Sequence, residues 1–158
     1  MSTSDLMFTT SAHGQVLHSQ VKEFIANRIA PIEARFWQDC HKLNPDGDWK
    51  KWQWPDAYES LRKEARQAGL WNLFLPDDTL GANLLVTDYA PIAELTGHSL
   101  LAPHIFNCNA PDSGNMELLW RYGSKTQQDK WLMPLLDGET RSVFCMTEPD
   151  VASSDATN

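Results

Sequence analysis

The residues best suited to bind a ligand lie in the last stretch of the sequence, VFCMTEPDVASSDATN, residues 143–158. There an alternating apolar run enters the turn Thr147-Glu148-Pro149, and the proline fixes the direction in which the chain leaves. A threonine at such a turn can present its hydroxyl and amide groups to a planar heteroaromatic ligand. A turn that only ends a strand has the same residues and is the commoner case. Taken alone, the pattern leaves both interpretations open.

Metal binding is a second chemistry to test in this stretch, because Glu148, Asp150 and Asp155 carry carboxylates. Their spacing does not match a Ca²⁺-binding loop, which also needs a glycine and a terminal glutamate. We therefore expect Asp150, Ser153, Ser154 and Asp155 to form a solvated polar loop, and no metal site is predicted.

Other catalytic patterns are absent from the sequence. The five histidines show no H-x-x-x-H spacing, and there is no G-x-G-x-x-G, Walker or G-x-S-x-G motif. Cys40, Cys108 and Cys145 are far apart and form no C-x-x-C pair. We therefore expect neither a zinc site nor a disulfide framework, and infer a reducing compartment.

Composition excludes several classes of partner. The 158 residues are enough for one domain with its own core. Thirteen Lys and Arg against 21 Asp and Glu give a net charge of -8, which argues against nucleic acid or an anionic membrane surface as the main partner. The first residues lack a secretory signal, and no apolar run has the length of a membrane span. We expect a protein that is not secreted and has no membrane span.

Helical periodicity covers most of the chain before residue 138 and predicts five or six helices. Residues 41–55 have turn signals without a period and are expected to form a connection. The first three expected helices are residues 14–30, ended or bent by Pro31, residues 55–69, closed by Gly69, and residues 87–97. Thr87 or Asp88 is expected to cap the third of these, with Pro91 in its first turn and Gly97 at its end. The remaining expected helices are residues 99–107, residues 113–123, opened by Ser113, and residues 124–134, opened by a Ser124/Gln127 capping box.

Seven tryptophans are many for a chain of this length. We expect the rings to seal the core or cover helix ends, because each buries a large apolar area. The alternative is an aromatic surface for a ligand or a partner domain. Three of the rings cluster in the connection and four lie in or beside apolar patterns: Trp49, Trp52 and Trp54, then Trp37, Trp71, Trp120 and Trp131.

The period changes in DGETRSVFCM, where Val143 and Cys145 share one face and Phe144 and Met146 the other. This alternation predicts a strand that begins near Arg141. A lone strand cannot satisfy its own backbone groups. It must pair with a partner chain or begin a second, β-rich domain, and we favour the second. The predicted fold is mainly α, with one strand at its end.

The stretch GSKTQQDKWLMPLLDGETRSVFCMTEPDVASSDATN resembles the signature region of the acyl-CoA dehydrogenases. GLWNLFLPDDTLG and DYAPIAELTGHS resemble earlier segments of that family, in the same order. FNCNAPDSGNMELLWRYG is most similar to the branch of large multidomain eukaryotic members and their bacterial relatives. The resemblance implies a disordered or extended N-terminus (1–13), an N-terminal α domain (14–138) and the start of a truncated middle β domain (139–158).

The resemblance also implies a site for FAD, which lies in the family between the β domain and a C-terminal helical domain. Thr147 is the hydroxyl expected near the flavin ring, and Ser154 is expected to touch the acyl-CoA substrate as well. The loop has one residue more than the common family form, so Ser153 remains an alternative to Ser154. The residues that match the family's FAD-contacting stretch are Phe144, Cys145, Met146, Thr147, Glu148, Pro149, Asp150, Val151, Ala152, Ser153 and Ser154.

The chemistry implied is α,β-dehydrogenation of fatty acyl-CoA thioesters in fatty acid β-oxidation, in which a glutamate removes the α-proton and FAD accepts the β-hydrogen as hydride. That base belongs to the C-terminal domain, so no catalytic residue is assigned here; Glu94, Glu117 and Glu139 match non-catalytic segments. We expect the 158 residues to be inactive alone.

Family partners would be an electron-transfer flavoprotein and further copies in a homo-oligomer. The compartment would be cytoplasmic in a bacterium, and mitochondrial or peroxisomal in a eukaryote.

Two other interpretations remain open. An acyl-CoA oxidase or a flavin monooxygenase could share this fold, because oxygen reactivity depends on access to the flavin. A non-catalytic helical interaction module could instead use its last strand to extend the sheet of a partner.

Overall fold

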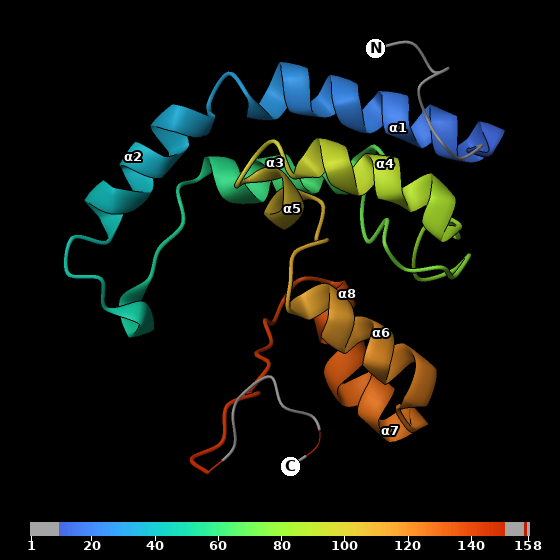
Figure 1. Cartoon of the computed structure of the whole chain (residues 1–158). Helices are drawn as coiled ribbons and strands as arrows, with labels where there is room; N and C mark the ends of the chain where they lie inside the picture. The colour runs from blue at the N-terminus through green and yellow to red at the C-terminus, as the bar shows by residue number, and fades with distance from the viewer. Residues whose placement is uncertain (1–9, 151–156, 158) are drawn as a thin grey trace. The chain divides into compact units, whose positions relative to one another are not determined.

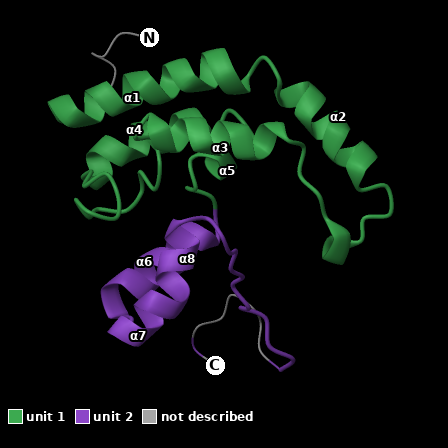
Figure 2. Ribbon diagram, turned by 180° about the vertical axis from the view of Figure 1, so that it is seen from behind, with its two compact units in different colours: residues 1–109 green, residues 110–158 purple. Residues whose placement is uncertain are grey.

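Helices make up nearly all regular secondary structure in residues 10–150 and 157, the part of the chain that the computed structural model describes. The predicted mainly helical fold is confirmed, and no described helix is long and apolar enough to cross a lipid bilayer. The chain divides into two compact units, residues 1–109 and 110–158 (Figure 2). The elements, labelled in Figure 1, are α1 (Ala12–Phe24), the π-helical turn η2 (Ile25–Ile29), α2 (Glu33–Leu43), the 3-10 turn η3 (Trp49–Lys51), α3 (Ala57–Gln67), α4 (Val86–Thr96), α5 (Ala102–Ile105), α6 (Asp112–Tyr122), α7 (Lys125–Gln127), the π-helical turn η4 (Gln128–Leu132) and α8 (Met133–Leu136).

Helix α2 is absent from the sequence-based prediction, in which Pro31 ends or bends the first helix. Residues 30–32 form a turn, and a new helix begins at Glu33. Phe36 and Cys40 lie one helical turn apart and are both buried, so they anchor α2 to the core of the first unit. The few apolar residues at helical spacing after Pro31 are too weak a pattern to predict a separate helix.

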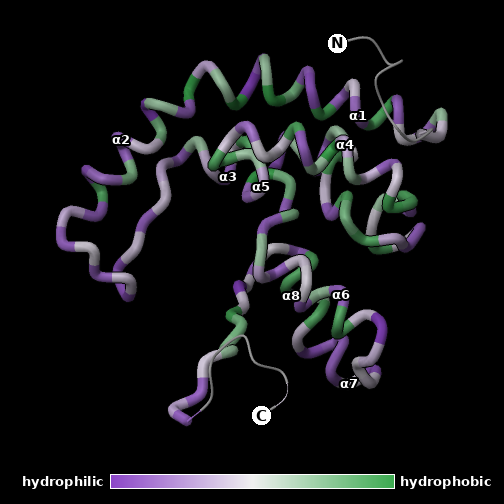
Figure 3. The backbone as a smooth tube through the Cα atoms, in the orientation of Figure 1, coloured by the Kyte–Doolittle hydropathy of each residue, from purple (hydrophilic) through white to green (hydrophobic). Residues whose placement is uncertain are grey.

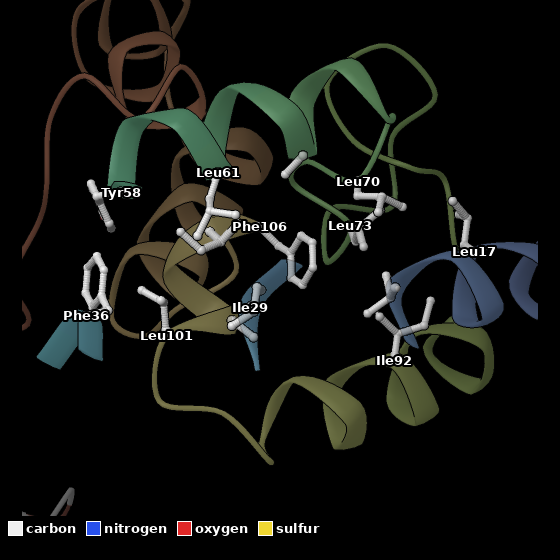
Figure 4. Close-up of a cluster of buried hydrophobic side chains, with 14 of the residues drawn as sticks. Leu17, Ile29, Phe36, Tyr58, Leu61, Leu70, Leu73, Ile92, Leu101 and Phe106 are labelled. Atoms are coloured by element: carbon white, nitrogen blue, oxygen red, sulfur yellow. The ribbon is translucent and has the colours of Figure 1, made fainter. Parts of the chain in front are cut away.

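The core of the first unit lies among α1, α3, α4 and α5 (Figure 4). Helices α1 and α4 pack side by side, with Leu17 and Val21 from one and Ile92 from the other. Phe106 is fully buried and meets Phe24 edge to face, with 5.4 Å between the ring centroids. The fully or nearly fully buried side chains in this core include Leu17, Val21, Ile29, Phe36, Tyr58, Leu61, Leu70, Leu73, Ile92, Leu101, Ile105 and Phe106.

The start of α1 is fixed by a residue from α4. Ser11 caps α1 by accepting a hydrogen bond from the Gly14 amide at 3.0 Å, and its own amide and hydroxyl donate to the Asp88 carboxylate at 2.6 and 2.9 Å. A Cβ on Gly14 would lie 2.6 Å from an Asp88 oxygen, so only glycine permits this approach. The prediction that Thr87 or Asp88 caps its own helix is therefore wrong: α4 begins after Leu85 without a side-chain cap.

Two asparagines hold the segment that follows α3 against the end of α5. Gly69 ends α3 at φ +73°, as predicted for a C-terminal cap. The Asn107 amide then donates to the Asn72 side-chain oxygen at 2.7 Å, and the Asn72 backbone amide donates to the Phe106 carbonyl at 3.1 Å. Both asparagines have φ of +54°, a conformation that asparagine tolerates better than most residues. The loop after Leu70 is therefore fixed by polar contacts as well as by buried leucines.

The second unit consists of α6, the continuous helix from α7 through η4 to α8, and the segment that follows. The predicted Ser124/Gln127 capping box is present in both directions. Gln128 donates to the carbonyls of Leu119 and Trp120 at 3.3 and 3.1 Å, which satisfies the end of α6. Two predicted boundaries were wrong. Helix α6 begins at Asp112 rather than Ser113, and the last helix passes Pro134 and ends at Leu136.

The strand predicted from Arg141 is not formed. Residues 141–147 have no regular secondary structure, and only Glu148 makes a single β-bridge. The alternating pattern remains, but a strand also needs a neighbouring backbone along its length. Side chains from Val143 to Asp150 are exposed.

The expectation that the tryptophans seal the core or cover helix ends holds in part, because Trp37 packs against the core and Trp54 stacks on Tyr58 in the first turn of α3. None of the seven rings is among the buried residues. The most exposed are Trp49 at 78%, Trp131 at 53%, Trp52 at 44% and Trp54 at 36%. The alternative of an aromatic surface therefore fits Trp49, Trp131 and Trp52, the three most exposed rings.

Candidate functional site

The residues predicted to contact a flavin lie at the end of the second unit. Phe144, Cys145, Met146, Thr147, Glu148, Pro149 and Asp150 are described, and all of them are exposed. Val151, Ala152, Ser153 and Ser154 lie outside the described residues, so the choice between the two serines stays a prediction. Within the described part, the segment lies at the surface, and Thr147 is among its exposed residues.

Asp112 anchors the chain where this segment begins. Its side chain is buried, and it accepts hydrogen bonds from the Ser142 amide at 2.7 Å and the Ser142 hydroxyl at 2.6 Å. Arg141 adds an ion pair, with its Nε 3.2 Å from a carboxylate oxygen. Because Asp112 lies in the first turn of α6, the helix dipole also favours its negative charge.

Asn115 forms the second part of the same anchor, one helical turn further along α6. Its amide nitrogen donates to the Ser142 hydroxyl at 2.8 Å and to the Val143 carbonyl at 3.3 Å. Asp112 and Asn115 therefore hold the backbone of residues 142–143 against the first turn of α6. This fixes the direction in which the candidate segment leaves the helices.

An open groove lies beside the anchor within the same unit. Its volume is about 470 Å³, and α6, η4, α8 and residues 140–142 form its walls. The leucines and the Trp131 ring supply an apolar surface, with Lys130 above that ring at 4.6 Å from the centroid. The lining residues are Asn115, Leu118, Leu119, Lys130, Trp131, Leu135, Thr140, Arg141 and Ser142.

The carboxylates near the site are engaged in structural contacts or exposed. Glu117 pairs with Arg121 on the surface of α6, at 2.8 Å. Glu139 is exposed in the turn after α8. In the described part of the chain, no group of three or more His, Cys, Asp or Glu residues could hold a metal ion.

The cysteines of the first unit are not poised for nucleophilic chemistry. Burial raises the pKa of the Cys108 thiol to about 11, beside the Tyr89 hydroxyl, whose pKa burial also raises. Burial likewise raises the pKa of Cys40. The thiolate is the reactive form, so both side chains are protonated and inert near neutral pH.

The anchoring residues are those that the sequence analysis missed. Asp112 and Asn115 are three positions apart, so they share one face of α6 at its start. Ser142 precedes the alternating run by one residue. An acidic and an amide residue at a helix N-terminus are ordinary capping residues, and nothing local indicates that their partner lies 30 positions further along.

Known proteins resemble this chain over nearly its whole length. The family model described as "Acyl-CoA dehydrogenase, N-terminal domain" matches residues 11–139. Acyl-CoA dehydrogenase family member 11 of Gallus gallus is 48% identical over 157 residues, which cover 99% of this chain and 19% of that protein. Acyl-CoA dehydrogenase family member 10 of Mus musculus is 46% identical over 147 residues, 90% of this chain and 13% of that protein.

A solved structure also resembles this chain. An acyl-CoA dehydrogenase from Mycobacterium abscessus is 52% identical and superimposes with a TM-score of 0.84, over 95% of this chain and 38% of that one. The chain thus spans about a fifth or less of the two animal relatives and well under half of the bacterial one. Family, fold and motif order agree, and this chain belongs to the acyl-CoA dehydrogenase family through its N-terminal domain.

Proposed function

We propose that this chain is the N-terminal part of an FAD-dependent enzyme that dehydrogenates fatty acyl-CoA thioesters between their α and β carbons. The match of residues 11–139 to the N-terminal domain of acyl-CoA dehydrogenases carries the proposal. Residues 14–138 form the α domain in this proposal, and residues 139–158 begin the β domain. The acceptor of electrons is an electron-transfer flavoprotein, and the whole enzyme is a homo-oligomer; both rest on the family alone.

We assign the FAD contacts to Phe144, Cys145, Met146, Thr147, Glu148, Pro149, Asp150, Val151, Ala152, Ser153 and Ser154, with Ser154 also touching the acyl-CoA. The exposure of residues 144–150 supports the assignment, since residues at the surface are accessible to a ligand. Bound FAD supplies the two-electron acceptor for the reaction. This chain positions the segment, because Asp112 and Asn115 fix residues 142–143 at its start.

We assign no catalytic base to the 158 residues. Glu117 is paired with Arg121, and neither Glu94 nor Glu139 belongs to the anchored segment. The chain alone therefore has negligible acyl-CoA dehydrogenase activity and holds FAD weakly or not at all. Its role in the reaction is to bind and orient.

A chimera with the relative from Mycobacterium abscessus tests the proposal. Residues 11–158 of this chain replace the matching N-terminal part of that protein, which is 52% identical over the compared region. Flavin absorbance and dye reduction by a panel of acyl-CoAs are measured, with the parent protein as the control. We expect flavin content and acyl-CoA-dependent dye reduction close to the values of the parent.

The same experiment separates the alternatives. A folded chimera without flavin, beside a flavin-containing parent, would contradict the proposal and favour the interaction module. Reduction of oxygen with peroxide release in place of dye reduction would favour an oxidase. A Thr147→Val chimera should lose flavin affinity, whereas Thr140→Val, outside the assigned stretch, should retain it.

A further inference from the structure

The connection between α2 and α3 exposes an unusual amount of aromatic surface. Unit 1 has eight exposed large hydrophobic side chains among its described residues, and four of them lie between positions 43 and 54. They are Leu43, Trp49, Trp52 and Trp54. We call residues 43–54 the tryptophan loop. Hydropathy alone does not reveal it, since the tube is coloured as hydrophilic to neutral through this connection (Figure 3).

The tryptophan loop is held in one conformation. The Asn44 side chain donates to the Gln53 carbonyl and accepts from the Gln53 amide, both at 2.8 Å, and so closes the loop. Trp54 stacks on Tyr58 of α3, with ring centroids 4.4 Å apart and planes at 11°. Trp52 meets Trp54 edge to face at 5.7 Å. The Trp52 and Trp54 rings are therefore held in place before any partner binds, which lowers the entropy cost of binding.

The position of the loop within its unit suits contact with an extended surface. In Figures 1 and 2 the α2–α3 connection extends away from the part of unit 1 formed by α1, α3 and α4. Trp49, at 78% exposure, lies in the η3 turn of this projecting segment. A projecting aromatic turn can enter a soft interface without rearrangement of the core.

The charge of the loop selects the kind of surface. Residues 43–54 contain two lysines and two aspartates, so the loop is neutral on a chain with a net charge of -8. Lys51 pairs with Asp48 at 3.3 Å, and the Lys50 amine lies 5.5 Å from the centre of the Trp49 ring. An anionic surface would repel the chain as a whole, whereas indole rings flanked by lysines suit the zwitterionic headgroup region of a lipid layer.

We propose that the tryptophan loop is a peripheral membrane-contact site that inserts Trp49 and Trp52 into a zwitterionic lipid interface. Both rings bring an apolar body and a polar N–H group, the combination that favours the boundary between headgroups and acyl chains. The contact is reversible and involves no membrane-spanning element. It is independent of the proposed enzymatic function, because it uses residues of the first unit far in sequence from 144–154.

Vesicle flotation of the complete 158-residue chain tests the proposal, because protein that aggregates without lipid stays at the bottom of the gradient and is not counted as bound. The probe is phosphatidylcholine vesicles, with and without added phosphatidylglycerol. The double variant Trp49→Ser/Trp52→Ser removes the inserted rings, and Trp131→Ser is the matched control, since Trp131 is also exposed and also lies beside a lysine. We expect the partition coefficient of the double variant to fall about tenfold or more, and that of the control to change less than about twofold.

Added phosphatidylglycerol should weaken binding of the unaltered chain because of the net charge of -8. Absence of binding to phosphatidylcholine, or equal losses in the double variant and the control, would overturn the proposal. So would a concentration-dependent dimer that the double variant abolishes, since a second copy would then cover the loop. Trp49→Ser alone, at the most exposed ring, provides the comparison if the double variant does not fold.

Discussion

Substitution of Asp112 by Ala should release the start of the candidate flavin segment from α6. Asp112 is 2% exposed, and its carboxylate accepts two hydrogen bonds from Ser142, at 2.6 and 2.7 Å. Hydrogen bonds to a charged group contribute about 1.5–3 kcal/mol each. Ser142 is only half-buried and regains bonds to water, so we expect a net loss of about 2–4 kcal/mol in the free energy of local opening.

Hydrogen exchange at the Ser142 amide reports this opening directly, because that amide donates to Asp112. A loss of about 2–4 kcal/mol corresponds to exchange that is roughly 30- to 1,000-fold faster. NMR resolves the single amide and shows whether the helices of the same unit retain their protection. We expect the amides of α8 to change far less than that of Ser142.

Glu117→Gln is the matched control on the same helix. It removes an exposed ion pair with Arg121, a contact of the kind that contributes about 0.2–1 kcal/mol. Its effect on the Ser142 amide should be negligible. If Asp112→Ala accelerates that amide by less than about threefold, or no more than Glu117→Gln does, the reasoning about the anchor is refuted.

Three further predictions concern stability and activity. Gly14→Ala should destabilise the chain by about 1–3 kcal/mol in chemical unfolding, because the added Cβ would lie 2.6 Å from Asp88. Gly114→Ala is the control and should stabilise the chain by up to about 1 kcal/mol, because its added Cβ would have no atom within 4 Å. If both variants change the free energy of unfolding in the same direction, the packing argument is contradicted. The Ser11 amide donates to Asp88 and holds the pKa of that carboxyl below its usual value. The ionised Asp88 carboxylate therefore contributes to stability above about pH 4, and this contribution disappears as the pH falls through the lowered pKa. In Asp88→Asn, the free energy of unfolding should depend less on pH in the acid range. The purified chain should show no FAD-dependent acyl-CoA dehydrogenation, and measurable turnover would contradict this expectation. It should also aggregate through the exposed side chains of Val143, Phe144 and Met146. A cooperative thermal transition of a monomer in dilute buffer would count against aggregation.

Features decided by a few neighbouring residues could be predicted from the sequence. The Ser124/Gln127 capping box and the left-handed Gly69 after α3 form as expected, because both depend on backbone groups within one helical turn. The buried stripe of Leu17 and Val21 follows from helical periodicity alone. The order of motifs was also sufficient to indicate the family.

Features that depend on distant residues could not be predicted. Asp88 has the sequence pattern of a cap for its own helix, but it accepts hydrogen bonds from Ser11, 77 positions earlier. Asp112 is an ordinary residue of a helix start until folding brings Ser142 to it. The alternation after Arg141 is correct as a pattern, yet the described residues form no strand ladder there, because a ladder requires a second backbone.

The sequence by itself therefore determined the helical class, the family and the stretch expected to face a flavin. The tertiary structure alone decided which side chains hold that stretch and that the tryptophans lie mainly outside the core. The physical reason is the range of the interactions. Caps and periodicity act within a few residues, whereas the burial of a ring and the partner of a carboxylate depend on which distant segments the fold brings together.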